Sequence, residues 1–122
     1  MKKILISIKK EYVDRIISGE KKYEFRTRVA KNDINKLIIY CTLPTKKVVA
    51  EAEIIGIIEM SKEELWNHTR DYAGIGEEAF MKYFSKNARA YAYKLGKITV
   101  YDREKELVEY GIKHAPQSFV YI

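Results

Sequence analysis

The segment Ser18-Gly19-Glu20-Lys21-Lys22-Tyr23-Glu24-Phe25-Arg26 sets the organisation of the chain, because a helix ends in it and a strand begins. Upstream, the apolar residues of 11–18 recur at helical spacing, and Gly19 is the residue type that ends a helix. Downstream, residues 22–28 alternate between aromatic or hydroxyl side chains and charged side chains. This period predicts a strand with one buried face and one charged face in solvent.

Three charged side chains of this segment are expected to converge. Lys21 stands where the strand begins, and Glu24 and Arg26 are two residues apart and share a strand face. Arg26 suits a phosphate or a base edge, Glu24 accepts hydrogen bonds from base N–H groups, and Lys21 neutralises a phosphate or acts as a base when desolvated. The alternative is a solvated strand whose ion pair is worth about 0–1 kcal/mol. If the chain is an enzyme, Lys21 and Glu24 are its predicted catalytic residues.

Outside this segment, the pattern predicts short strands interrupted by one pair of helices. A regular alternation of strands and helices is absent from the sequence, which argues against a doubly wound parallel sheet. The long strand expected to bend near Gly56 suits a small barrel. We therefore expect an α+β fold, a small mixed β-barrel with helices packed around it, as one domain over residues 1–122. The expected elements are strands at 4–8, 37–43, 48–59, 88–95, 98–101 and 119–122, helices from Ser61 and Glu77, a turn at Gly96 and a charged turn at 102–106.

The chain has 122 residues, a net charge of +6 and a pI near 9.3, which favours an anionic partner. The charge is uneven: residues 1–50 hold 13 basic and 5 acidic groups, whereas residues 51–81 hold 2 and 8. The single cysteine, Cys41, excludes a disulfide within the chain and a zinc site made of thiolates. His68 and His114 stand far apart, so we expect no metal and no cofactor. The apolar runs are too short for a membrane span or a signal sequence, which predicts a cytoplasmic protein.

The spacing Gly19-x-Lys21-x-x-Glu24-x-Arg26 resembles the G-x-K-x-x-E-x-R signature of the ASCH domain, a family of the PUA-like superfamily. Residues 4–12 are similar to the family's opening strand and helix, and residues 115–119 resemble tails of its members. The resemblance implies a PUA-like barrel with a cleft between the barrel and the first helix, lined by the motif. It also implies an RNA- or nucleotide-binding module in RNA metabolism or in the regulation of transcription or translation.

One bacterial branch of that family is an amidohydrolase that removes acetyl from acetylated cytidine. There the motif lysine activates a threonine at the position of Glu24, and a carboxylate from the later helical region assists; Glu77 and Glu78 are the candidates here. Glu24 in place of the threonine argues against the same covalent mechanism. An amidohydrolase acting on acetylated cytidine or a related nucleoside, by direct activation of water, remains the alternative function.

Two further pairs complete the predicted ligand-binding set of Ser7, Lys9, Lys21, Glu24, Arg26, Tyr91 and Tyr93. Ser7 and Lys9 share a face of the first strand and either approach a phosphate in the cleft or lie on a solvent-facing edge. Tyr91 and Tyr93 share a strand face and either stack on a base or fill the barrel. The third function considered is a protein-interaction module that uses the acidic segment 51–81.

Overall fold

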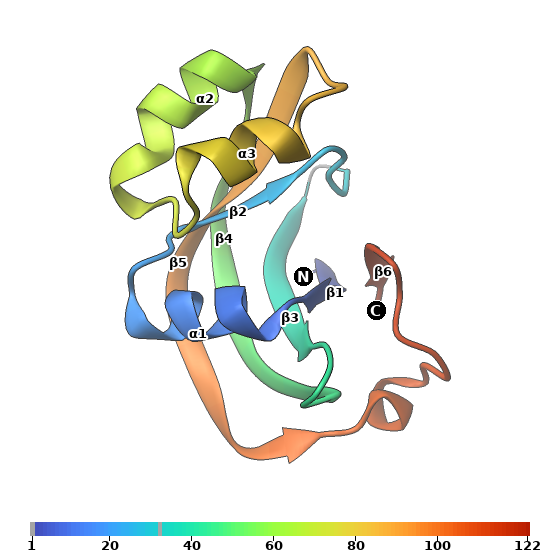
Figure 1. The fold of residues 1–122 in the computed structure, drawn as a ribbon. Helices are drawn as coiled ribbons and strands as arrows, with labels where there is room; N and C mark the ends of the chain where they lie inside the picture. The colour runs from blue at the N-terminus through green and yellow to red at the C-terminus, as the bar shows by residue number, and fades with distance from the viewer. Residues whose placement is uncertain (1, 32) are drawn as a thin grey trace.

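The structure is a computed structural model that describes residues 2–31 and 33–122, and it shows an α+β fold with one six-stranded mixed sheet (Figure 1). The helices α1, α2 and α3 lie against this curved sheet. In chain order the elements are β1 (Lys2–Ile8), α1 (Lys10–Ser18), β2 (Tyr23–Arg26), β3 (Ile34–Cys41), β4 (Lys47–Ser61), α2 (Lys62–Thr69), the 3₁₀ helix η1 (Arg70–Tyr72), α3 (Glu77–Tyr83), β5 (Arg89–Lys105), the 3₁₀ helix η2 (Leu107–Tyr110) and β6 (Phe119–Tyr121).

The parallel pair β1–β3 is buried on both faces of the sheet. Ile4 and Ile6 point into the main core with Val13 and Ile16 of α1, whereas Leu5 joins a separate cluster on the opposite face. Burial on both faces explains why these strands are nearly continuous apolar runs rather than alternating ones. Helix α1 ends at Gly19, whose φ of 90° is the left-handed conformation expected of a glycine that stops a helix.

The strands β4 and β5 pair along most of their length and curve together (Figure 1). The predicted turn at Gly96 and the predicted charged turn at 102–106 are wrong, because β5 runs unbroken from Arg89 to Lys105. Gly96 marks a close approach instead: a Cβ there would lie 2.8 Å from Ile55 Cγ2. The strand pairing is irregular next to this contact, between Ile54 and Gly56. The glycine thus allows the two strands to bend without a turn.

The sheet is open, so the predicted closed barrel is corrected. The strand order β2-β5-β4-β3-β1-β6 leaves β2 and β6 at opposite edges with no ladder between them. Side chains bridge the gap: the Arg28 guanidinium lies 5.9 Å from the Phe119 ring, and the Lys31 N–H donates to Tyr121 Oη at 3.1 Å. Arg26 Nη2 also crosses from β2 to the backbone oxygen of Ser7 on β1 at 2.8 Å. These contacts therefore join the two edges without a backbone ladder.

The helical pair α2 and α3 covers a second core above β2 (Figure 1). Ser61 caps α2 as predicted, since its hydroxyl accepts from the Glu64 N–H at 3.2 Å. Phe25 of β2 packs edge-on against Phe80 of α3 with ring centroids 5.0 Å apart. Trp66 of α2 is buried in the same cluster. The apolar face of β2 therefore fixes where the helical pair lies above the strand.

Tyr93 of β5 anchors the loop between β2 and β3 to the sheet through a hydrogen bond. Its side chain is 0% exposed, and its hydroxyl accepts a hydrogen bond from the buried Ala30 N–H at 2.7 Å. Burial raises the pKa of this phenol, which stays neutral and paired. Tyr91, two residues earlier on β5, is only partly buried and donates a 3.3 Å hydrogen bond to Glu59.

We expect Tyr93→Phe to lower the free energy of unfolding by about 1–3 kcal/mol, because the Ala30 N–H would be left buried without an acceptor. Tyr91→Phe is the matched control and should change it by less than about 0.5 kcal/mol, since its hydroxyl bond is long and exposed. Urea unfolding followed by circular dichroism measures both. Equal effects of the two variants would contradict the structural role assigned to Tyr93.

Candidate functional site

A cavity of about 640 Å³ lies between the sheet and α1, a size typical of small-ligand sites. Its walls come from the ends of β1 and β2, the first turns of α1, the helix α3 and the tail that precedes β6. The cleft that the family resemblance implies is therefore present, and α3 and the tail bound it as well. The lining residues are Ser7, Ile8, Lys9, Tyr12, Lys21, Glu24, Phe25, Arg26, Thr42, Ile75, Ala79, Lys82, Tyr83, Ala115, Pro116 and Gln117.

Lys21 is a buried lysine, only 4% exposed, on one wall of the cavity. Its ammonium donates a 2.8 Å hydrogen bond to the Ala73 carbonyl and lies 4.7 Å from the centre of the Phe25 ring and 5.3 Å from that of Tyr12. Burial lowers the pKa of this group from 10.5 to about 8; Glu24 opposes the shift, and Arg15 and Arg26 add to it. Both the charged and the neutral amine are thus accessible near neutral pH.

Glu24 and Arg26 form a buried ion pair, with side chains 8% and 13% exposed. Glu24 Oε2 accepts from Arg26 Nε at 3.0 Å and from Nη2 at 2.8 Å. The alternative of a solvated charged strand is therefore wrong at Glu24 and Arg26. The reason is that Phe25, on the opposite face of β2, packs under the helical pair. Glu24 and Arg26 therefore lie on the other face of the strand, where Arg26 reaches β1.

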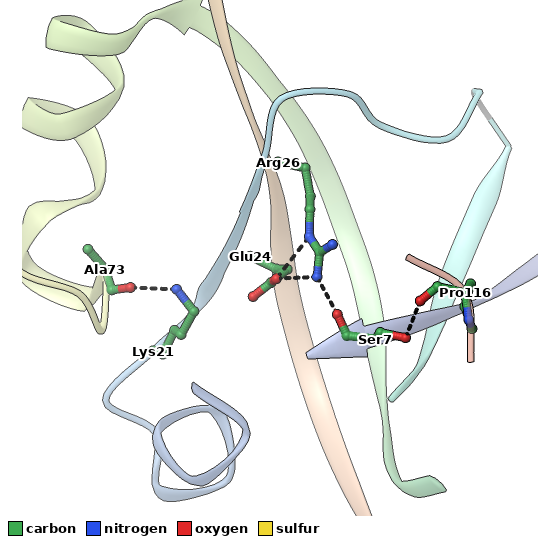
Figure 2. Close-up of polar contacts among 6 residues, drawn as sticks. All are labelled: Ser7, Lys21, Glu24, Arg26, Ala73 and Pro116. Carbon is green, nitrogen blue, oxygen red and sulfur yellow. Dashed lines mark hydrogen bonds and ion pairs between the residues drawn. The ribbon is translucent and has the colours of Figure 1, made fainter. Parts of the chain in front are cut away.

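One oxygen of Glu24 and one nitrogen of Arg26 remain available to a ligand. Within the described part of the chain, no hydrogen bond reaches Glu24 Oε1 or leaves Arg26 Nη1, and no buried side-chain polar atom is left without a partner. These two atoms must therefore be accessible from the cavity. Figure 2 shows the free carboxylate oxygen on the side of Lys21, which bonds Ala73 and forms no ion pair with Glu24. The gap between amine and carboxylate can hold a group that both accepts and donates hydrogen bonds.

Gly74 packs directly against the side chain of Lys21. Gly74 has a φ of +64°, and a Cβ there would lie 2.4 Å from Lys21 Cβ. Its carbonyl accepts a 2.9 Å hydrogen bond from Arg15 Nη1, which ties α1 to the same loop. Only a glycine fits this position, because it combines a left-handed backbone with contact against the lysine stem.

Ser7 joins the motif to the C-terminal tail. Its backbone oxygen accepts from Arg26, and its hydroxyl donates to the Pro116 carbonyl at 2.7 Å (Figure 2). The Ser7 N–H also donates to the Ser118 carbonyl at 3.2 Å. The two ends of the chain therefore meet at the cavity and form part of its wall.

Five of the seven residues predicted to bind a ligand line the cavity, namely Ser7, Lys9, Lys21, Glu24 and Arg26. Tyr91 and Tyr93 do not line it. Tyr93 has no exposed ring surface on which a base can stack, so the prediction of a stacking surface there is corrected. Tyr93 pairs with Glu24 across β5 and β2, but its side chain belongs to the main core rather than to the cavity wall.

Sequence reasoning missed the aromatic walls of the cavity, Tyr12, Phe25 and Tyr83, and the cation Lys82. Phe25 stands inside the motif, but its alternation indicated only a core residue. Tyr83 and Lys82 come from α3, and their approach to the motif depends on the packing of Phe80 on Phe25, which no local pattern encodes. The resemblance of residues 115–119 to family tails was the one signal for the C-terminal wall.

Much of the remaining charge is paired away from the cavity. Lys2, Lys10, Lys36 and Lys47 form ion pairs with Asp33, Asp14, Glu51 and Glu106, respectively. In the acidic segment 51–81, Glu51 and Glu59 are held by Lys36 and Arg89. A partner protein on that segment stays a prediction. Across residues 2–31 and 33–122, no three His, Cys, Asp or Glu side chains gather as metal ligands do, and no described helix is long and apolar enough to cross a bilayer.

We expect Gly74→Ala to lower the free energy of unfolding by about 2 kcal/mol or more, because it adds backbone strain and a clash with Lys21. Gly76→Ala is the matched control: a Cβ there meets no atom within 4 Å and φ is −74°, so the expected cost is only that of a poorer N-cap for α3, about 1 kcal/mol or less. Urea unfolding of both variants makes the comparison. A Gly74→Ala protein as stable as its control would show that the loop does not press on Lys21.

Comparisons with known proteins agree with the fold and the motif. The family model of the ASCH domain matches residues 6–115. The chain is 32% identical over 95 residues to an ASCH domain-containing ribonuclease of Zymomonas mobilis, which covers 77% of this chain and 64% of that protein. It is also 27% identical over 120 residues to the ATP synthase subunit alpha of Ureaplasma parvum, covering 98% of this chain but 15% of that protein. The chain thus spans less than two thirds of these relatives.

Solved structures give the same result. The crystal structure of ASCH from Z. mobilis superposes with a TM-score of 0.89 at 26% identity, covering 98% of this chain and 87% of that one. The N-terminal domain of Staphylothermus marinus McrB superposes with a TM-score of 0.52 at 14% identity, covering 88% and 77%, and shares the fold alone. With the family model matched over residues 6–115 and the motif Gly19-x-Lys21-x-x-Glu24-x-Arg26 lining the cavity, the chain belongs to the ASCH domain family.

Proposed function

We propose that this chain binds RNA and holds one of its nucleotides in the cavity of Lys21, Glu24 and Arg26. The proposal rests on one observation: the same cavity contains two polar atoms without a partner in the described part of the protein, Glu24 Oε1 and Arg26 Nη1, and aromatic side chains in its walls. Glu24 Oε1 accepts hydrogen bonds from the N–H groups of a base edge, and Arg26 Nη1 donates to its oxygens or to a phosphate. Phe25, Tyr12 and Tyr83 provide apolar surface of the kind on which unstacked RNA bases lie.

The cations at the mouth of the cavity suit the phosphates that flank such a nucleotide. Lys9 and Lys82 are exposed lining residues from two different elements, one before α1 and one in the last turn of α3. Neither forms an ion pair among the residues that the structure describes. They are free to neutralise phosphate, whereas several other lysines of the N-terminal half already have carboxylate partners. The name of the Z. mobilis relative, a ribonuclease, supports RNA as the ligand.

A second candidate function is cleavage of the bound RNA. It is favoured because an amine, Lys21, and a carboxylate, Glu24, lie in the same cavity without forming an ion pair with each other. In this reaction the 2′-hydroxyl oxygen attacks the adjacent phosphorus, and Glu24 Oε1 takes the hydroxyl proton. The bond from phosphorus to the next nucleotide's 5′-oxygen breaks, and the Lys21 ammonium gives that oxygen a proton. Arg26 stabilises the charge that builds on the phosphoryl oxygens. The same amine and carboxylate also suit an amide, so acetylated cytidine is kept as a second substrate to test.

The binding proposal predicts a salt-dependent affinity for short single-stranded RNA, measured by fluorescence anisotropy. Lys9→Ala/Lys82→Ala should reduce the slope of log affinity against log salt by about 1.4, because two phosphate contacts are lost at about 0.7 per contact. Lys94→Ala/Lys97→Ala is the control, since it removes the same charge from exposed positions of β5 outside the cavity. Equal slopes for the two double variants would reject the cavity as the binding site.

The cleavage proposal predicts a rate that falls as pH rises through about 8, because the Lys21 ammonium, the proton donor, loses its proton over that range. Lys21→Met removes the donor at similar volume and should abolish cleavage, whereas Lys22→Met, an exposed neighbour, should leave the rate unchanged. Gel analysis of labelled RNA and chromatography of acetylated cytidine separate the two substrates. Cleavage that is absent, or equal in wild type and Lys21→Met, rejects this candidate and leaves the binding proposal standing.

A further inference from the structure

We propose that Lys21 is a nucleophilic amine that condenses with an aldehyde bearing a phosphate group to form an imine within the cavity. This proposal goes beyond RNA binding and does not depend on it. The shared chemistry, an aldehyde close to a phosphate, occurs in small phosphorylated aldehydes and in the ring-opened sugar of a nucleotide that has lost its base.

The surroundings of the Lys21 amine favour a nucleophile over an ion-pairing group. Its contacts are one backbone carbonyl, that of Ala73, and the faces of Phe25 and Tyr12. It forms no ion pair with a carboxylate in the described chain, and Arg15 and Arg26 both disfavour its charge. A lysine that is desolvated and close to other cations is the kind that reacts with carbonyl compounds.

The cavity supplies the other groups that the reaction needs. The neutral Nζ forms a bond to the carbonyl carbon while the carbonyl electron pair moves to oxygen, and a proton passes from nitrogen to that oxygen. Glu24 relays a proton from solvent to the hydroxyl, which leaves as water while the nitrogen lone pair forms the C=N bond. The iminium nitrogen then returns its proton to solvent through Glu24, which leaves the imine. Arg26 Nη1 and Lys9 are positioned to hold the phosphate, and the volume of about 640 Å³ accommodates a small phosphorylated compound.

The amine also has the protonation behaviour that imine formation requires. With a pKa of about 8, Lys21 is half neutral at that pH. A lysine with the ordinary value of about 10.4 is neutral there in only about one molecule in a few hundred. Because a less basic amine is intrinsically less nucleophilic, we expect a rate advantage of about tenfold rather than the full ratio of neutral fractions.

The test is reductive trapping of the full chain at about pH 8 with cyanoborohydride, which delivers hydride to the imine and fixes it as a secondary amine. One arm uses pyridoxal 5′-phosphate as a free phosphorylated aldehyde, and the other a single-stranded DNA oligonucleotide with one base-less site. Peptide mapping by mass spectrometry locates the adduct and separates Lys21 from the α-amino group, which also reacts with aldehydes. Lys21→Met and Lys22→Met are the matched variants, one in the cavity and one exposed.

We expect the Lys21 peptide to be labelled about tenfold faster than the Lys22 peptide, with the label lost in Lys21→Met and kept in Lys22→Met. Labelling of Lys21 in either arm supports the proposal, and the arm in which it occurs identifies the source of the aldehyde. Lys21 labelled no faster than Lys22 in both arms overturns it. The RNA affinity of the same wild-type protein, measured separately, shows whether RNA binding holds, so the two proposals fail independently.

Discussion

The site depends on one guanidinium that crosses the open seam of the sheet. Arg26 of β2 donates to the backbone oxygen of Ser7 on β1 and to Glu24 on its own strand. The edge strands β2 and β6 form no backbone ladder with each other, and this charge-assisted bond links β2 to β1 instead. Ser7 in turn holds the tail at Pro116. Seam, motif and C-terminal wall are therefore one hydrogen-bonded unit.

Burial of the charged side chains of Lys21, Glu24 and Arg26 costs free energy. The structure offsets this cost for Glu24 and Arg26 but not for Lys21. Glu24 and Arg26 compensate each other, and their free atoms face the cavity. Lys21 has no such partner, and the lowering of its pKa to about 8 corresponds to a free-energy cost on the order of 3 kcal/mol for its charged form in the native state. A methionine would remove that cost, and a lysine retained in such a place points to a use for its amine rather than to stability.

The local elements were predictable where one residue type determines them, and the long-range arrangement was not. Gly19 ends α1 and Ser61 caps α2, because a left-handed glycine and a hydroxyl cap act within one turn of chain. At Gly96 the same reasoning failed. The sequence does not distinguish a glycine that leaves room for the Ile55 side chain of the neighbouring strand from a glycine in a turn. The alternation of β2 was recognised, but the pattern alone left open whether its charged face lies in solvent or in a cleft. The burial of that face depends on contacts with β1, which is not adjacent in the sheet order.

The distribution of charge along the sequence also did not predict where free cations lie in the fold. Blocks of net charge suggested one basic face, yet many of those lysines are neutralised by nearby carboxylates. The cations that remain at the cavity are few: Lys9 before α1, Lys21 and Arg26 of the motif, and Lys82 of α3. A ligand therefore meets specific atoms at fixed positions rather than a diffuse positive surface. Because the tail of residues 115–117 forms one wall and is held through Ser7, changes in that short segment alter the shape of the cavity without touching the motif.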